Sequence, residues 1–440
     1  MVKHYHFVGI GGISMSALAL ILHKQGIVVS GSDINENEQT VELRKYDVMV
    51  FIGHNVVNIS SSVTNLVING AISNDNPELV IAKERGLEIV DRSVLLAEIS
   101  KSYKNVIAVA GTSGKSTTTA MIGAIFVEAE LLPTVHNGAV LMSGSGGLGL
   151  VQGSDEYFIT EACEFKRSFL TLRPRISVIT NVNPDHMDCY DDFDDLKKTF
   201  FDFGFGSGKV IVNNDCKNSK LISTNFANAV TIGIKNKADI MATDIIEYKR
   251  GKYKFTVAVN STKFDIQLNV FGYHNIYNAL AAIAVGVEFG VQPDVIAKAL
   301  YYYKGIARRF EEITQIGKTK IISDYAHHPI EVATTIKTCS KLFDKFLVVF
   351  QPHTYSRTKA LFNEFKEVLG NCNVVLYKTY SAREKPIKGG SAHDLAKSLG
   401  MKYFSTKTAL EKFVDKNIEK YDAVIFVGAG DIDLIARSFN

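Results

Sequence analysis

A lysine and a serine follow a glycine-containing loop, and side chains of these types could together hold the phosphates of a nucleotide. The sequence reads AGTSGKSTTT over residues 110–119, directly after the apolar run Val106–Ala110 and before a segment rich in small residues. Glycines let backbone N–H groups approach phosphate oxygens, Lys115 adds positive charge, and the Ser116 hydroxyl can join a Mg²⁺ shell. This order of strand, loop and helix predicts a phosphate site made of Gly111, Thr112, Ser113, Gly114, Lys115, Ser116 and Thr117.

The loop departs from the general P-loop pattern at one position. The pattern GxxxxGK[ST] requires a glycine where Val109 stands, so the bare motif is incomplete. A glycine turn with a solvated lysine is the alternative interpretation. The strand before the loop and the helix after it favour the phosphate site.

Carboxylates and a histidine follow the next two predicted strands. Strand Tyr157–Glu161 ends in an acid, and strand Ile176–Asn181 leads into the segment NPDHMD, which contains His186. Carboxylate oxygens suit Mg²⁺ and a neutral imidazole can complete its shell. A carboxylate of the cluster EACE at residues 161–164 and the imidazole of His186 are therefore candidate Mg²⁺ ligands beside the phosphate loop. A surface histidine without a ligand is the alternative interpretation of His186.

A second glycine cluster lies near the start of the chain. Strand Tyr5–Ile10 leads through GIGGIS into a predicted helix, Met15–Lys24, and a second strand, Ile27–Ser30, ends near an acid. This βαβ pattern is typical of dinucleotide binding, with glycines at the phosphates and the acid at a ribose hydroxyl. The candidate residues are Gly9, Gly11, Gly12 and Asp33. Taken alone, the pattern is compatible with NAD, or with glycines that only allow close packing of the helix on the strand.

Polar residues also follow strands farther along the chain. GYHNIYN at residues 272–278 precedes an alanine-rich helix, Ala279–Phe289, and its amides could contact adenine, although a polar helix cap is the alternative. Later in the chain, strands Thr319–Ser323, Phe346–Phe350 and Ala423–Val427 are each followed by polar clusters containing His, Arg, Tyr or Asp. Because such strand ends lie at one edge of an α/β sheet, these clusters are expected to face a ligand.

The composition limits the possible classes of protein. The chain has 440 residues, 46% of them hydrophobic, and 8 prolines, which suits about three packed domains. A formal net charge of +3 offers no broad field for nucleic acid or an anionic membrane, so an anion must be bound locally. The five cysteines form no CxxC pair, which favours a cytoplasmic protein without zinc or a disulfide framework. The apolar run Ala17–Leu22 is flanked by glycines and by Lys24, so neither a signal peptide nor a spanning helix is expected.

Several of these segments, taken in order, resemble the Mur ligases. The segments are HFVGIGGISMSALA, AGTSGKSTTT, EACEFKRSFL, TNVNPDHMDCY, GYHNIYNALAAIAV, GIARRF, DYAHHP and FQPHTYSRT, and the similarity covers essentially the whole chain. The resemblance implies an α/β fold of three domains. These are an N-terminal Rossmann-like domain for a UDP-sugar (1–104), a central P-loop-type ATPase α/β domain (105–306) and a C-terminal Rossmann-like domain for an amino acid (307–440). It also reassigns the first glycine cluster from NAD to the diphosphate of the UDP-sugar.

The resemblance implies an ATP-dependent reaction that forms an amide. The lactyl carboxylate of UDP-N-acetylmuramate would attack the γ-phosphate of ATP, and the amine of L-alanine would attack the resulting acyl phosphate, in peptidoglycan precursor synthesis. ATP and Mg²⁺ are the expected cofactors, and a monomer or weak homodimer is expected. Because little covalent chemistry falls to the protein in such a reaction, positioning and charge neutralisation must supply most of the barrier reduction.

The same resemblance assigns roles to individual residues. The catalytic set would be Lys115, Glu161, His186 and Arg309, and the Mg²⁺ ligands would be Ser116, Glu161 and His186. ATP would be bound by the phosphate loop together with His274, Asn275, Asn278 and Asp324. The alanine pocket would contain Tyr325, His327, His353 and Arg357. An arginine suits this pocket because its guanidinium fork can bind both oxygens of a carboxylate.

The chain departs from the commoner family motifs at several positions. Ser113 stands where a histidine is usual in the phosphate loop, and Lys166 and Arg167 replace acidic or small residues. The usual IGG is not evident near His136, and Asn69 and Gly70 stand where a serine pair usually precedes alanine. These last two departures leave the exact muropeptide substrate open. The choice among alanine, serine and glycine is open for a different reason, because these amino acids differ by one small group, which a pocket separates by only about 1–3 kcal/mol.

Two other functions are compatible with the sequence. A murein-peptide ligase would attach a recycled tripeptide to the same UDP-sugar, but FQPHTYSRT favours the enzyme that takes a single amino acid. An inactive nucleotide-binding paralogue would act as a regulator, but such a protein has no need of the set Lys115, Ser116, Glu161 and His186.

Overall fold

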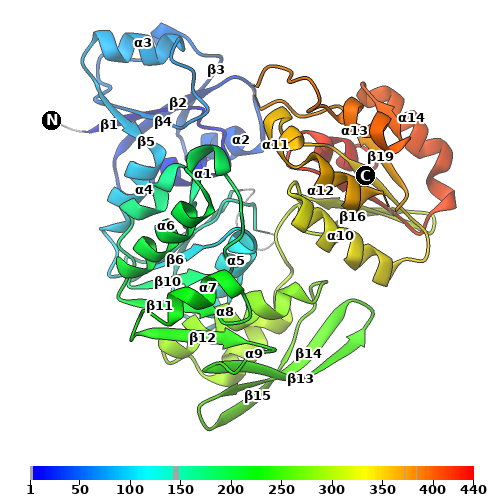
Figure 1. Ribbon diagram of the computed structural model, residues 1–440. Coiled ribbons are helices and arrows are strands. Elements are labelled where there is room, and N and C mark those ends of the chain that lie inside the picture. Colours follow the sequence, from blue (N-terminus) through cyan, green and yellow to red (C-terminus); the bar gives the residue numbers. More distant parts are fainter. Residues whose placement is uncertain (1–2, 142–147, 371, 383) are drawn as a thin grey trace. The chain divides into compact units, whose positions relative to one another are not determined.

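The computed structural model describes residues 3–141, 148–370, 372–382 and 384–440 (Figure 1). The chain forms two compact units, Met1–Ile246 with Tyr253–Ile306 and Glu247–Lys252 with Ala307–Asn440. Three sheets of five, ten and six strands organise the described residues, and helices pack on them. The predicted α/β fold class is therefore confirmed.

The first sheet is parallel and has the strand order β3-β2-β1-β4-β5. Its strands are β1 His4–Val8, β2 Val28–Asp33, β3 Met49–Ile52, β4 Asn65–Ile68 and β5 Glu88–Asp91. Its helices are α1 Ile13–Lys24, α2 Glu38–Arg44, the short η1 Val56–Asn58, α3 Pro77–Glu84 and α4 Arg92–Ser100. The prediction that β1 extends to Ile10 and that α1 starts at Met15 is wrong, because the chain turns at Gly9 with φ +80° and Gly12 caps the helix.

The second sheet has ten strands in the order β15-β14-β13-β12-β11-β10-β6-β9-β7-β8. The strands are β6 Asn105–Ala110, β7 Thr134–His136, β8 Leu150–Val151, β9 Tyr157–Glu161, β10 Ile176–Ile179, β11 Lys209–Asn213, β12 Ala229–Gly233, β13 Ile240–Lys249, β14 Lys252–Val259 and β15 Thr262–Gln267. The helices are α5 Lys115–Glu128, η2 Phe165–Thr171, η3 Met187–Cys189, α6 Phe193–Phe205, α7 Lys217–Ser223, α8 His274–Glu288 and α9 Pro293–Tyr302. Strands β9, β6, β10 and β11 are parallel neighbours, whereas β14 and β15 form an antiparallel pair at one edge (Figure 1). The carboxyl ends of β6, β9 and β10 consequently meet at one edge of the sheet.

Helix α8 begins earlier than the sequence predicted. It starts at His274 and not at Ala279, because Gly272 turns the chain with a left-handed φ of +101° and Tyr273 caps the helix. Asn275 and Asn278 therefore lie within the first turns of the helix rather than in a loop that precedes it.

The second unit holds a six-stranded sheet in the order β16-β17-β21-β18-β19-β20. The strands are β16 Glu311–Ile316, β17 Thr319–Asp324, β18 Phe346–Phe350, β19 Val374–Tyr377, β20 Lys402–Phe404 and β21 Ala423–Val427. The helices are α10 Pro329–Leu342, α11 Tyr355–Ala360, α12 Phe362–Leu369, α13 Ala392–Leu399, α14 Lys407–Asn417, η4 Ile418–Lys420 and α15 Ile432–Arg437. Strand β16 is antiparallel to β17, and the other pairs are parallel. The carboxyl ends of β17, β21 and β18 therefore share one edge.

One hydrophobic core joins the first sheet to the central sheet within the first unit. Helix α1 contributes Leu18, α4 contributes Leu95 and η2 contributes Phe169 to the same buried cluster. Full burial of a side chain of this size stabilises the fold by about 1.5–3 kcal/mol. The shared core holds α1 against β7, which brings the N-terminal glycine loop to the central sheet.

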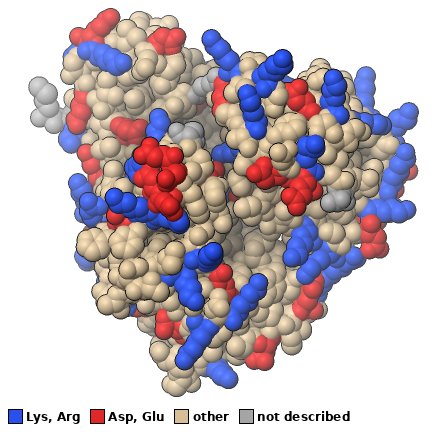
Figure 2. All heavy atoms as spheres, in the orientation of Figure 1, with Lys and Arg blue, Asp and Glu red and all other residues tan. Residues whose placement is uncertain are grey.

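Basic and acidic side chains are interspersed over the face of the molecule shown in Figure 2, in keeping with the small net charge of +3. The five cysteines all lie among the described residues, and they form no disulfide with one another. Within the described residues, the helices are all too short or too polar to cross a membrane.

Candidate functional site

The loop Gly111–Gly114 joins β6 to α5 at the carboxyl edge of the central sheet. Gly111 has φ +135° and Gly114 has φ +87°, backbone conformations that residues with a side chain rarely adopt. A Cβ atom at Gly114 would also lie 2.5 Å from Oδ1 of Asn278 on α8. The glycines therefore allow a tight turn that ends at the N-terminus of α5, where the helix dipole favours anions.

The segment that follows β10 holds the phosphate loop in shape. The Asn181 carbonyl accepts a hydrogen bond from the Thr112 N–H at 3.1 Å, and its side-chain Oδ1 accepts one from the Ser113 N–H at 3.0 Å. The Thr180 hydroxyl donates to the Ser113 carbonyl at 2.7 Å. Because the same segment continues to His186, it ties the loop to that candidate metal ligand.

The Lys115 ammonium is paired with a carboxylate inside the protein. Its Nζ donates to the Gly111 carbonyl at 2.5 Å and lies 3.1 and 3.2 Å from the two carboxylate oxygens of Glu164. The Lys115 side chain is 17% exposed and that of Glu164 is 1% exposed. Burial alone would lower the pKa of Lys115, but nearby negative charge, above all that of Glu164, outweighs burial and raises the pKa. The lysine is therefore charged at neutral pH and holds a carboxylate where a phosphate is expected.

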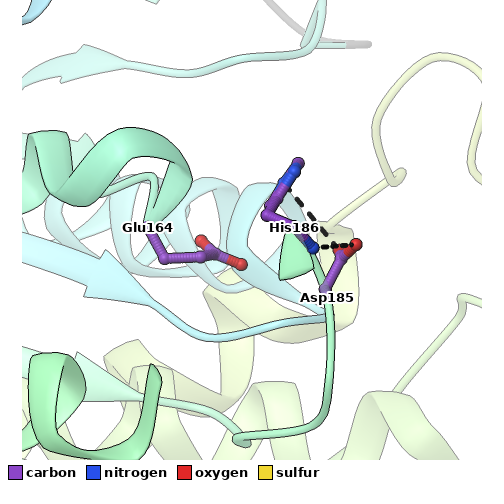
Figure 3. Close-up of side chains that lie close together, drawn as sticks. All are labelled: Glu164, Asp185 and His186. Carbon is purple, nitrogen blue, oxygen red and sulfur yellow. Dashed lines mark hydrogen bonds and ion pairs between the residues drawn. The ribbon is translucent and has the colours of Figure 1, made fainter. Parts of the chain in front are cut away.

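Glu164, Asp185 and His186 form a group of potential metal ligands (Figure 3). One ligand atom from each residue lies within 4.8 Å of the other two, and no second group of this kind occurs among the described residues. The backbone N–H of His186 donates to Asp185 Oδ1 at 2.8 Å, and the Glu164 carboxylate points toward this pair in Figure 3. Two carboxylates and an imidazole are a donor set that suits a divalent cation.

Ser116 and Glu161 are linked through the turn after β7. The Asn137 side-chain amide donates to the Ser116 carbonyl at 2.9 Å, and the Gly138 N–H donates to Glu161 Oε1 at 2.6 Å. A Cβ atom at Gly138 would lie 3.0 Å from that oxygen, so glycine lets the acid approach the backbone. The unusual sequence near His136 thus retains a glycine where Glu161 requires one.

The residues that follow Glu164 are held in an unusual conformation. Lys166 and Arg167 are left-handed, with φ of +50° and +58°, and this conformation costs about 1–2 kcal/mol for each residue that is not glycine. Arg167 makes a two-pronged ion pair with Asp195 at 3.0 and 2.6 Å, and the Tyr190 hydroxyl donates to the Glu164 carbonyl. Contacts with the segment after β10 therefore fix the backbone that carries Glu164.

The N-terminal glycine loop is supported by polar side chains next to the first sheet. The Gly11 N–H donates to Asp33 Oδ2 at 2.9 Å, and the Gly11 carbonyl accepts from Asn37 Nδ2 at 3.1 Å. A Cβ atom at Gly11 would lie 2.6 Å from Asn37 Nδ2, so the close approach requires glycine. Asp33 thus shapes the loop that Gly9 and Gly12 complete, and its contact with a ribose hydroxyl stays a prediction.

Two amide side chains of α8 lie against the phosphate-loop helix. The Thr118 hydroxyl donates to Asn278 Oδ1 at 3.3 Å, and Asn278 Nδ2 donates to Asn275 Oδ1 at 2.8 Å. Asn275 in turn donates to the Phe271 carbonyl at 2.8 Å. The structure therefore brings Asn275 and Asn278 to the phosphate loop, while His274 opens the same helix.

In the second unit, Asp324 ends β17 and its side chain is buried. Its carboxylate accepts backbone hydrogen bonds, including one from the Phe310 N–H at 2.9 Å. Burial raises the pKa of Asp324, and the nearby Arg309 guanidinium opposes this rise. Arg309 lies 4.0 Å from the Glu331 carboxylate, so the basic and acidic groups at this strand end are close together.

The four candidates for amino-acid binding lie together at the ends of β17 and β18. The His327 ring centroid is 5.5 Å from that of Tyr325 and 5.7 Å from that of His353. Arg357 Nη1 lies 3.3 Å from His353 Nδ1 and donates to the His353 carbonyl at 3.1 Å. Burial, with the charges of His327 and Arg357, lowers the pKa of His353 to about 4. The cluster therefore combines a neutral imidazole with an arginine.

Sequence reasoning named Glu161 and His186 as metal ligands but missed Glu164 and Asp185. Both missed residues stand in the same short motifs as the named ones, EACE and NPDH. The second acid of EACE and the single acid of NPDH were the available signals. Arg92 was also missed. Its hydrogen-bond partner, Ser14, is 78 residues away in the sequence, and no motif connects the two.

Family models cover most of the chain. The model described as Mur ligase family, catalytic domain, matches residues 4–104, the Mur ligase middle domain matches residues 109–286, and the Mur ligase, glutamate ligase domain, matches residues 308–430. The chain belongs to the Mur ligase family. It has the three-domain architecture of the Mur ligases, and the residue boundaries of those domains stay a prediction.

This Mur ligase is similar over nearly its full length to named relatives. It is 42% identical to the UDP-N-acetylmuramate–L-alanine ligase of Caldicellulosiruptor bescii, over 98% of this chain and 96% of that protein. It is 39% identical to the enzyme of that name from Clostridium perfringens, over 99% and 97%. The solved UDP-N-acetylmuramate–alanine ligase of Thermotoga maritima matches with a TM-score of 0.84 and 30% identity, over 99% and 98%. A murein peptide ligase from Psychrobacter arcticus has a TM-score of 0.76 at 22% identity, which is a likeness of fold.

Proposed function

We propose that this Mur ligase joins L-alanine to the lactyl carboxylate of UDP-N-acetylmuramate and converts ATP to ADP and phosphate, in peptidoglycan precursor synthesis. The main support is a lysine-ended phosphate loop beside a group of metal-ligating side chains, in a chain 42% identical to a UDP-N-acetylmuramate–L-alanine ligase. A regulator that only senses a nucleotide would need the loop but not the acid and imidazole groups next to it.

The phosphoryl transfer would rely on charge neutralisation by this chain. On nucleotide binding, Lys115 would exchange the Glu164 carboxylate for the β- and γ-phosphates, at the N-terminus of α5. The lactyl carboxylate would then attack the γ-phosphorus, ADP would leave, and an acyl phosphate would result. The neutral amine of alanine would attack the acyl carbon, phosphate would leave, and the amine would lose a proton as the amide forms.

The side chains around the loop fit Mg²⁺. Glu164, Asp185 and His186 supply two carboxylates and an imidazole. Ser116, in the first turn of α5, would add a hydroxyl, and Glu161, which lies outside that group, would add a carboxylate. When bound, Mg²⁺ would neutralise the negative charge of the phosphates. We expect Ser116 and Glu161 to hold one ion and His186 to take part in a second site.

The second unit would supply the amino-acid pocket and further contacts to the nucleotide. Tyr325, His327, His353 and Arg357 give aromatic and imidazole walls with a cation that can bind the alanine carboxylate. A pocket of this kind separates alanine from glycine or serine by only about 1–3 kcal/mol. Arg309 and Asp324 would reach the nucleotide, with adenine near His274, Asn275 and Asn278.

Phosphate release tests the proposal directly. The full-length protein is supplied with UDP-N-acetylmuramate, ATP and Mg²⁺, and then with L-alanine, L-serine, glycine or a muropeptide tripeptide in separate reactions. We expect release that depends on L-alanine. Release with the tripeptide alone would indicate a recycling ligase, and no release with any amine, despite ATP binding, would indicate a regulator.

The enzyme is proposed to act in the cytoplasm as a monomer or weak homodimer.

A further inference from the structure

A chain of hydrogen bonds joins the N-terminal glycine loop to the central sheet inside the first unit. Arg92, the first residue of α4, donates from Nη1 to the Ser14 hydroxyl at 3.0 Å. The Ser14 oxygen lies 2.9 Å from His136 Nε2. On the other side of the ring, His136 Nδ1 lies 2.8 Å from the Thr160 oxygen, next to Glu161. The chain thus runs from the first turn of α1 to the strand that carries a candidate metal ligand.

The protons of this chain can be assigned. The Thr160 hydroxyl donates to the Glu161 carbonyl at 3.1 Å, so its oxygen accepts from His136 Nδ1–H. A neutral imidazole then has Nε2 as its acceptor, which takes the Ser14 proton. His136 is 2% exposed, and burial with the charge of Arg92 lowers its pKa to about 3, so the ring is neutral. The Ser14 oxygen then accepts a hydrogen bond from Arg92. Each hydrogen bond of the chain therefore has one donor and one acceptor.

Arg92 carries a charge that the described residues do not balance. Its side chain is half-buried, and its hydrogen-bond partner among these residues is the Ser14 hydroxyl, with no carboxylate at ion-pair distance. Other arginines of the protein behave differently, since Arg167 pairs with Asp195 and Arg437 pairs with Glu311. A guanidinium has five donors, and most of those of Arg92 are available to an anion. Removing a cation from water without a partner is costly, so an anionic ligand would offset that cost.

We propose that Arg92 binds the diphosphate of the UDP-sugar, which rests on the function proposed above. The predicted diphosphate cradle is the loop at Gly9, Gly11 and Gly12, and Gly12 caps α1 just before Ser14. Ser14 therefore holds the guanidinium beside the cradle. An arginine can bind two phosphate oxygens at once through its fork, which a hydroxyl or a lysine cannot.

The experiment compares Arg92→Gln and Arg92→Lys with Arg44→Gln, all in the full-length protein. Arg44 lies in the same domain, is 40% exposed and pairs with Glu36, so its substitution changes the charge equally away from the loop. Calorimetry with UDP-N-acetylmuramate, UDP and uridine measures the dissociation constants. We expect Arg92→Gln to weaken binding of the first two ligands by about tenfold or more and to leave uridine binding unchanged. Arg92→Lys is expected to lose less, and Arg44→Gln to bind like the wild type.

Kinetics and stability separate ligand binding from a structural role. With Arg92→Gln, the KM for UDP-N-acetylmuramate should rise while the KM values for ATP and alanine stay as in the wild type. Unchanged binding of UDP and UDP-N-acetylmuramate overturns the inference, and a loss seen with UDP-N-acetylmuramate but not with UDP overturns the assignment to the diphosphate. Equal losses for uridine and ATP, with a lower unfolding temperature, would also overturn it. Failure of the proposed function itself is a different result, because the wild type would then not bind UDP-N-acetylmuramate.

Ser14→Ala provides a second variant that keeps the guanidinium. It removes the group that holds Arg92 but not the charge, so UDP binding should weaken less than with Arg92→Gln. A larger loss for Ser14→Ala than for Arg92→Gln would overturn a direct contact between Arg92 and the diphosphate.

Discussion

The two glycine loops of the first unit differ in how a neighbouring cation is balanced before a ligand arrives. At the central loop, Lys115 is paired with the buried carboxylate of Glu164. At the N-terminal loop, the hydrogen bond of Arg92 within the described residues goes to the neutral hydroxyl of Ser14. Nucleotide binding would therefore exchange one anion for another, whereas UDP-sugar binding would add an anion to an uncompensated cation. Because the Glu164 carboxylate must be displaced, the exchange makes the free energy of nucleotide binding less favourable. The same carboxylate keeps Lys115 in position before the nucleotide arrives.

Removal of the paired lysine should have the largest effect. Lys115→Ala takes away the charge expected at the transferring phosphates, so kcat/KM should fall by about a thousandfold, as for loss of a key electrostatic group. Calorimetry should find UDP-N-acetylmuramate binding unchanged, because that ligand is assigned to the other loop. Lys104→Ala is the matched control, since Lys104 is 68% exposed and pairs with Glu156 in the same part of the chain. Wild-type turnover by Lys115→Ala would disprove the role of the central loop.

Glu164→Gln breaks the pairing itself. Without the carboxylate, Lys115 need not exchange partners, so ATP should bind more tightly in the absence of metal. The apparent affinity for Mg²⁺ in the reaction should fall by about 10- to 100-fold, since Glu164 is also one of the three potential metal ligands. Calorimetry without metal and a Mg²⁺ titration of activity measure the two effects, with Glu156→Gln as the control. An unchanged Mg²⁺ dependence would remove Glu164 from the metal site.

Arg357→Lys extends the comparison to a third cation. An ammonium cannot reproduce a two-pronged contact with a carboxylate, so the KM for alanine should rise by roughly tenfold. The KM values for ATP and UDP-N-acetylmuramate should change little. The acyl phosphate should still form and be trapped by hydroxylamine, because it precedes attack by the amine. If the KM for alanine did not change, His353 and Tyr325 would be left as the candidates for that pocket.

The smallest expected effect concerns His136, whose ring joins Ser14, next to the N-terminal loop, to Thr160 of the central sheet. Its pKa is about 3 in the folded protein and 6.5 in an ordinary environment. Below pH 6.5 the unfolded chain therefore binds a proton that the folded chain does not, and stability falls as the pH falls. Urea unfolding should show that His136→Gln reduces this slope by about 1 kcal/mol per pH unit between pH 6 and pH 4. His353 contributes a similar pH dependence in the wild type and in His136→Gln. The measured quantity is therefore the difference between the two proteins in how their unfolding free energy changes with pH. Parallel curves would mean that His136 is not buried neutral.

The sequence predicted best where function requires a local order of elements. Strands β9, β18 and β21 have the predicted bounds, and the phosphate loop lies between a strand and a helix as expected. The prediction failed where single glycines set the backbone, as at Gly9 before α1 and Gly272 before α8. The partner of Lys115 was missed because its choice depends on the left-handed backbone after Glu164, which no periodicity encodes. The contact between Arg92 and Ser14 depends on the packing of separate segments, so no local pattern could reveal it.

The two left-handed residues after Glu164 have a consequence for how this protein could be stabilised. Glycine at Lys166 would relieve the steric cost of its φ of +50°, by about 1 kcal/mol or more. The same change would remove a side chain and loosen the backbone that aims Glu164 at Lys115. A screen for thermal stability alone would therefore favour glycine here, and the selected variants would lose turnover. At this position, a substitution that raises thermal stability is expected to lower catalytic activity.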